Sequence, residues 1–150
     1  MKFAKKVVIA VGMFDDISKQ MTPLKSMSFL SQSEVHFVHV FNTINYSTLM
    51  GDFPMVYPVE VDRKAIQESI VSILANISKE YMPTGSEGHI YHHCLFDENP
   101  KKKFCNYVKE SHADLVIIPT RDKHNMFDSS FAQYVNKHSP ANTLILKMHL

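Results

Sequence analysis

The sequence predicts an α/β domain with a parallel sheet covered by helices on both faces. Runs of β-branched apolar residues alternate with segments of helical apolar spacing along the whole chain. The strand-like runs at 6–11 and 114–119 are nearly continuously apolar, which is typical of strands buried on both sides. The last third is the most informative, because a buried run (114–119), a loop, a helical segment and a second buried run (143–148) follow in order.

The first half contains two predicted strands, at residues 6–11 (KVVIAV) and 35–41 (VHFVHVF). Between them apolar residues recur at every third position and predict a helix; these are Met21, Leu24, Met27 and Leu30. Thr22 as N-cap with Pro23 in the first turn would begin this helix, and otherwise Pro23 kinks a longer one.

Residues 42–61 contain Gly51, Pro54 and Pro58 and show no clear period, so they predict a long loop. Its apolar side chains at 49–57 could cover the strand ends as a lid or contact a second subunit. The sequence leaves both interpretations open.

The second half continues the alternation of helix and strand. Asp62 is the predicted N-cap of a helix whose apolar stripe comprises Ile66, Ile70, Ile73, Leu74, Ile77 and Tyr81. The remaining predicted elements are a strand at 89–96, a helix opened by Asn99 and Pro100 and ending at 111, a strand at 114–119, a helix capped by Ser129 or Ser130, and a strand at 143–148. No repeat or linker interrupts residues 1–150, which predicts one domain.

Composition narrows the classes of partner. The 150 residues carry a net charge of +1, which gives no reason to expect nucleic acid or an anionic membrane as a partner. Two cysteines are too few for a disulfide framework, and this favours a reducing cytoplasm. The apolar run at the N-terminus is too short to span a bilayer, so we interpret it as a strand.

Ligands of parallel sheets lie beyond the carboxyl ends of the strands, where the strand order reverses. The corresponding segments are 12–16, the chain after Val40, 96–99 and 119–130. The last of these contains no glycine, so a loop of inward-pointing N–H groups around phosphates is difficult to build there.

Other constellations favour structural roles. On a strand, His92 and Cys94 face one side and His93 the other, which leaves too few converging ligands for zinc. His36 and His39 also face opposite sides, and at least one is predicted to be a satisfied core residue. The serines at 129–130 near His124 or His138 lack a nucleophile elbow.

The lysines at 101–103 are predicted to lie on a solvated helix face. A phosphate-binding patch is the weaker alternative, because the rest of the chain lacks matching basic residues.

The chain resembles the universal stress protein family. The matching pieces are VVIAV, VHFVHVF, FDENPKKKFCNYVKESHADLVIIPTR and SSFAQYVNKHSPANTLILK, in the family's order over nearly the whole length. The resemblance implies a three-layer α/β sandwich. Its five-stranded parallel sheet has the order 3-2-1-4-5 and is flanked by helices. Such a fold is Rossmann-like, of the adenine nucleotide alpha hydrolase type.

The resemblance also locates a nucleotide site. ATP-binding members close the first strand with Asp and carry a G-x2-G-x9-G-[ST] loop after the fourth, with adenine near the end of the second. In this chain the Asp position is Gly12, and the first two loop glycines fall on Pro119 and Asp122. The residues implied as contacts are Gly12, Val40, Thr120, Arg121, Ser129 and Ser130.

The departures from that pattern argue against ATP. A carboxylate at Asp122 close to a triphosphate would be repelled by about 3–4 kcal/mol per charge pair. Arg121 or a metal ion held by Asp122 could offset part of this repulsion. We therefore expect no cofactor, with ATP as the alternative.

The leading hypothesis is a cytoplasmic stress-response protein without catalysis. It would form a homodimer through its fifth strand, Asn142 to Met148. It would also bind an unidentified protein partner. The alternative is a regulator that binds ATP or AMP at the implied contacts. An enzymatic function ranks below both, because S-G-G-x-D-S is absent after the first strand and no His-x-Gly-His occurs early in the chain.

Overall fold

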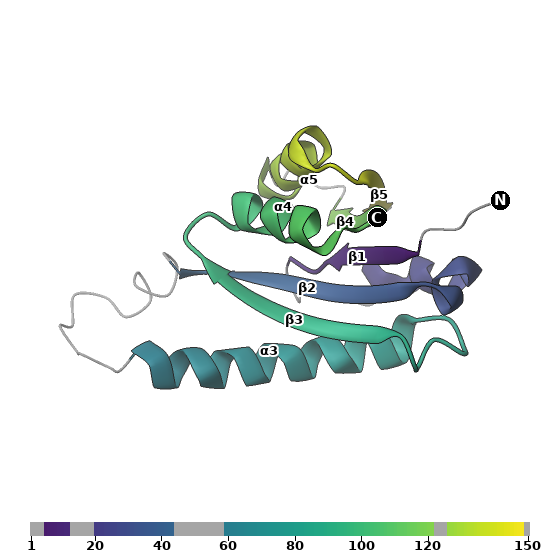
Figure 1. Ribbon diagram of the computed structural model, residues 1–150, viewed down its shortest axis with the longest axis horizontal. Coiled ribbons are helices and arrows are strands. Elements are labelled where there is room, and N and C mark those ends of the chain that lie inside the picture. Colours follow the sequence, from purple (N-terminus) through teal and green to yellow (C-terminus); the bar gives the residue numbers. More distant parts are fainter. Residues whose placement is uncertain (1–4, 13–19, 44–58, 122–125, 149–150) are drawn as a thin grey trace.

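A computed structural model describes residues 5–12, 20–43, 59–121 and 126–148 (Figure 1). They form one five-stranded sheet in the order β3-β2-β1-β4-β5, and every pairing is parallel. The strands are β1 (Lys6–Ala10), β2 (Glu34–Asn42), β3 (Ile90–Asp97), β4 (Leu115–Arg121) and β5 (Asn142–Met148). The predicted strand order is confirmed.

The helices form a layer on each face of the sheet. α3 (Val59–Tyr81) lies on one face, and α4 (Pro100–Ser111) and α5 (Met126–His138) lie on the other (Figure 1). Two short 3-10 helices, η1 (Thr22–Ser26) and η2 (Ser28–Gln32), contribute buried leucines to the α3 side. The fold is therefore the predicted three-layer sandwich.

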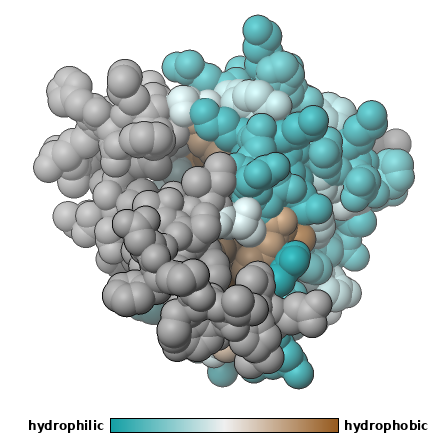
Figure 2. Space-filling model, turned by 90° about the vertical axis from the view of Figure 1, so that its left-hand side faces the viewer, coloured by the Kyte–Doolittle hydropathy of each residue, from teal (hydrophilic) through white to brown (hydrophobic). Residues whose placement is uncertain are grey.

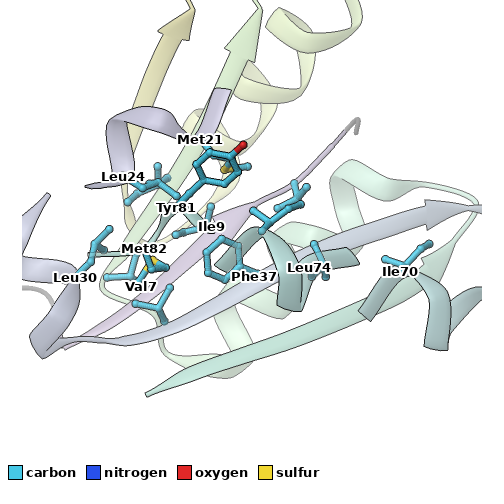
Figure 3. Packing of buried hydrophobic residues seen from close by; sticks show 14 of the residues in the cluster. Val7, Ile9, Met21, Leu24, Leu30, Phe37, Ile70, Leu74, Tyr81 and Met82 are labelled. Carbon is cyan, nitrogen blue, oxygen red and sulfur yellow. The ribbon is translucent and has the colours of Figure 1, made fainter. Parts of the chain in front are cut away.

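The continuously apolar strand runs follow from this double covering. In β1, Val7 and Ile9 point into the core on the α3 side, while Val8 and Ala10 point into the core below α4 and α5. All four side chains are at most 5 % exposed. Figure 3 shows the first core, where Val7 and Ile9 pack with Phe37 of β2 and with residues of α3.

The helix predicted over 21–30 is wrong as an α-helix. The segment forms η1 and η2, separated at Met27 (φ −91°, ψ 78°), and Met21 is the N-cap residue without a side-chain cap. The spacing of three residues matches the 3.0 residues per turn of a 3-10 helix, and Leu24 and Leu30 lie within η1 and η2 whereas Met21 and Met27 flank them. Leu24 and Leu30 are fully buried as a consequence.

Two predicted helix starts are also wrong. α3 begins at Val59, so Asp62 lies inside the helix and does not cap it. α5 begins at Met126, so Ser129 and Ser130 are its fourth and fifth residues instead of caps. Most of the loop predicted at 42–61 lies outside the described residues.

The predicted start of α4 is confirmed. The Asn99 side chain accepts a hydrogen bond from the backbone N–H of Lys102 at 3.3 Å, and Pro100 occupies the first turn. His112 ends the helix in the left-handed conformation (φ 56°). Asp114 then accepts hydrogen bonds from the backbone of Lys5 and Lys6, which fixes β1 beside β4.

Replacement of Leu74 with alanine should lower the free energy of unfolding by about 2–5 kcal/mol. The Leu74 side chain is fully buried in the core on the α3 side, so its loss leaves a cavity there. Urea denaturation of the purified variants measures the change.

The neighbouring Ile73, which is 39 % exposed, provides the control. Ile73→Ala should cost less than about 1 kcal/mol. Equal losses for the two variants would contradict the burial of α3 described above.

Candidate functional site

The carboxyl ends of the parallel strands form one edge of the molecule. The strand order reverses between β1 and β4, so a ligand is expected beside the ends of these two strands. Figure 2 views the molecule from the end at which β2 and β3 finish, and shows an apolar patch next to hydrophilic residues. The implied contact residues belong to β2, β4, α5 and the segment after β1.

Gly12 and Val40 lie at or near this edge, after β1 and close to the end of β2. Gly12 is exposed, and a Cβ atom added to it would meet no described atom within 4 Å. The Cβ atom of an aspartate, the residue that the resemblance implies for ATP binding at this position, would therefore meet no described atom. Val40 is half-buried and packs against the core below α4 and α5.

Thr120 uses its hydroxyl within the sheet. The side chain is 8 % exposed, and Oγ1 donates a hydrogen bond to the carbonyl of Leu146 at 3.3 Å. This bond joins β4 to β5 and commits the hydroxyl hydrogen. Arg121 ends β4, but its side chain and that of Ser129 lie outside the described parts of the structure.

Ser130 can offer only its hydroxyl to a ligand. As the fifth residue of α5 it lies beyond the first turn, where backbone N–H groups already bond within the helix. Its Oγ accepts a hydrogen bond from Nζ of Lys101 at 2.8 Å. This contact brings the first turn of α4 to the start of α5.

Lys101 is a site residue that the sequence offered only as part of a weaker alternative. The lysines at 101–103 were predicted to be solvated, and Lys102 is exposed, whereas Lys101 is half-buried against Ser130. A usable signal was its position directly after β3, because every segment that follows a parallel strand starts at the same edge. Lys101 supplies a positive charge beside Ser130.

Aromatic side chains line the same end on the α3 side. The rings of Phe41 and Phe96 lie 5.7 Å apart, and the Arg63 guanidinium lies 4.6 Å from the centre of the Phe96 ring. A guanidinium at this distance makes a favourable cation–π contact. Phe96 is therefore held between α3 and β2.

The histidines behave as predicted. His92 contacts Ser78 of α3, whereas His93 contacts Tyr107 of α4, so the two face opposite sides. His39 is 9 % exposed, and its Nδ1–H donates to the carbonyl of Val11 at 2.6 Å, which confirms a satisfied core histidine.

No group of three His, Cys, Asp or Glu side chains within the described ranges is arranged to hold a metal ion.

Ser78 and His92 resemble a nucleophile and base but cannot act as a pair in this arrangement. Ser78 Oγ lies 2.8 Å from His92 Nε2 and donates its hydrogen to the carbonyl of Ala75 at 2.9 Å. His92 must then donate to Ser78, so its Nε2 cannot accept the serine proton.

Both cysteines are buried. Burial raises the pKa of the Cys94 thiol to about 11 and also raises that of Cys105. Cys94 belongs to the core on the α3 side and Cys105 to the core below α4 and α5.

Comparison with protein families decides the assignment. The model of the universal stress protein family matches residues 26–147. The chain belongs to the universal stress protein family. A search among curated proteins gives no match.

Solved structures of universal stress proteins share the fold. A protein from Lactobacillus plantarum is 14% identical, with a TM-score of 0.60 and coverage of 95% of this chain and 97% of that one. A protein from Arabidopsis thaliana with AMP bound is 16% identical, with a TM-score of 0.57 and coverage of 97% and 92%. A protein from Archaeoglobus fulgidus in complex with dAMP is 18% identical, with a TM-score of 0.53 and coverage of 98% and 100%.

Within the described residues, no helix has both the length and the apolar character needed to cross a bilayer.

The stability of this universal stress protein should fall as the pH drops below about 6.5. Burial lowers the folded-state pKa of His39, His92 and His93 below the ordinary histidine value of 6.5, so the unfolded chain binds more protons in this range. The stabilisation is fully present above pH 6.5 and is lost as the pH falls. Urea unfolding at pH 8 and at pH 5 measures it.

Two glutamine variants separate buried from exposed histidines. His92→Gln should reduce the stability difference between the two pH values, because it removes one buried titrating ring. His89→Gln, at an exposed position, should leave the difference unchanged. A stability that is higher at pH 5 than at pH 8 would contradict this assignment.

Proposed function

We propose that this universal stress protein is a non-catalytic, cytoplasmic stress-response protein that acts as a homodimer and through contacts with another protein. The edge strand β5 is the single observation that supports this most directly. The absence of glycine in the loop after β4 supports a role without ATP, as does the Thr120 hydroxyl bound to Leu146. The donor role of His92 toward Ser78 supports the absence of hydrolytic catalysis.

β5 offers an exposed apolar edge. It pairs with β4 at one end of the sheet order, which leaves its other side open among the described strands. Leu144 and Ile145 are each 37 % exposed, and as consecutive strand residues they point to opposite faces. An unprotected edge with apolar side chains favours pairing with a second copy.

We expect the protein to elute as a species of twice the chain mass of 17.2 kDa in size-exclusion chromatography with light scattering. The double variant Leu144→Glu, Ile145→Glu should be monomeric, because charges on both faces of β5 oppose its pairing across an interface.

Ile73→Glu is the matched control, since Ile73 is similarly exposed but lies on α3. It should remain dimeric. A monomeric wild-type protein would refute the homodimer, and equal dissociation of both variants would refute the role of β5.

Nucleotide binding is the second candidate function. It is favoured by the contact between Lys101 and Ser130, which places a cation at the edge where the missing glycines would have bound phosphates. It is also favoured by relatives of the same fold that were solved in complex with cAMP, with AMP bound and in complex with dAMP.

Thermal unfolding with ATP, ADP, AMP and cAMP, with and without Mg²⁺ or Mn²⁺, separates the two functions. The leading proposal predicts no change in Tm. A nucleotide at 100 times its Kd would instead stabilise the fold by about 2.7 kcal/mol and raise Tm by several degrees.

Lys101→Gln and Lys102→Gln form a matched pair for the second function. A Tm shift that Lys101→Gln abolishes and Lys102→Gln retains would establish nucleotide binding at this edge. It would overturn the leading proposal of a role without ATP. A shift that both variants retain would place the nucleotide away from Lys101.

A further inference from the structure

A chain of polar contacts crosses the sheet face below α4, away from the carboxyl edge. Lys6 Nζ lies 3.3 Å from Glu34 Oε2, and the same oxygen lies 3.0 Å from His36 Nε2. On the other side of the ring, His36 Nδ1 lies 2.8 Å from His93 Nε2 and 3.2 Å from the hydroxyl of Tyr107. The chain connects β1, β2, β3 and α4.

The direction of each hydrogen bond follows from the ends of the chain. The ionised Glu34 can only accept, so His36 must carry its hydrogen on Nε2. In a neutral ring Nδ1 is then an acceptor, and His93 Nε2–H donates to it. The Tyr107 hydroxyl lies 3.2 Å from the same nitrogen and makes the weaker contact, because the single lone pair of Nδ1 points to His93. Because burial and the nearby Glu34 raise the Tyr107 pKa to about 12, it keeps its proton at any lower pH.

The two imidazole rings meet edge to edge. Their planes differ by 13°, yet the nitrogens are only 2.8 Å apart, which is closer than the roughly 3.5 Å at which two ring faces can pack. The shared hydrogen therefore lies between the nitrogens, in the planes of both rings. The ring of Tyr91 stacks on His36 at a centroid distance of 4.8 Å and keeps it in this orientation.

We propose that His36 and His93 form an acid-sensitive bridge, which holds one extra proton and opens when the pair takes up a second. With one proton added, His93 becomes an imidazolium and still donates through Nε2 to His36. With two added, both facing nitrogens carry hydrogens, and the 2.8 Å contact can no longer exist. Opening of the bridge separates the edge strand β3 from α4 and β2 at this point.

The charges around the pair support the two separate steps. Glu34 attracts the first proton, and Lys6 on β1 opposes it. His92, on the opposite face of β3, adds positive charge near His93 when it is protonated. The pKa of His93 is lowered by burial first, and then by repulsion from His36 and His92.

The hydrogen bond with His36 lowers the pKa of Glu34 below its usual value. This favours the ionised carboxylate as the acceptor at this end of the chain of contacts.

The test is a pH titration of the full chain in which NMR records the ¹⁵N chemical shifts of the histidine ring nitrogens. The shifts of His36 and His93 should each report the same two steps, separated by more than about 1 pH unit, as expected for a strongly coupled pair. In His93→Gln, His36 should titrate in a single step. His92→Gln should retain both steps of the pair.

Amide hydrogen exchange provides the structural readout. Corrected for intrinsic rates, exchange of residues 90–97 should increase when the pH falls through the second step, and His92→Gln should show the same increase. If His93→Gln fails to fold, Tyr107→Phe takes its place in the test. Tyr107→Phe removes the hydroxyl that contacts His36, so the pH values of both titration steps should change.

Independent single-step titrations of His36 and His93 in the wild-type protein would overturn the proposal. Unchanged exchange in β3 across the second step would overturn the opening of the bridge.

Discussion

The structure depends on burial of the sheet on both faces at once. β1 is its central strand, and its alternate side chains are buried in two separate cores. Since burying a Val or Ile side chain contributes about 1.5–3 kcal/mol, each strand stabilises both helical layers. A polar substitution at an odd-numbered position of this strand would therefore destabilise the packing against α3. One at an even-numbered position would destabilise the packing against α4 and α5. The same parity separates His92 from His93 and so creates the polar chain below α4.

The sequence predicted elements well where burial alone determined them. The apolar runs at 6–11 and 114–119 located β1 and β4, because a strand covered on two faces needs apolar residues at nearly every position. The other three strands were located by β-branched and aromatic residues between turn signals. Helix starts were less predictable, because capping residues are only a local preference. Asp62 and Ser129 are good caps, yet both lie inside helices. The spacing of three residues through Met21 and Leu24 already contained the 3-10 period, which resembles an α-helical stripe over so short a segment.

The candidate site was predictable in place but not in detail. Topology placed Gly12, Val40 and Thr120 at one edge, because parallel strands end together. Topology cannot show that the Thr120 hydroxyl is committed to Leu146 or that Lys101 reaches Ser130. These contacts depend on rotamers and on the approach of α4 to α5, which no local pattern encodes. The pairing of His36 with His93 likewise required the register of β2 against β3.

The positions of the two cysteines limit how this protein can respond to oxidants. Cys94 and Cys105 lie in different cores with the sheet between them, so no internal disulfide can form while the fold is intact. Their thiols also remain protonated at neutral pH, and only the thiolate reacts readily with peroxide. Exposure of the folded chain to hydrogen peroxide would therefore leave the sulfur atoms of both cysteines unoxidised.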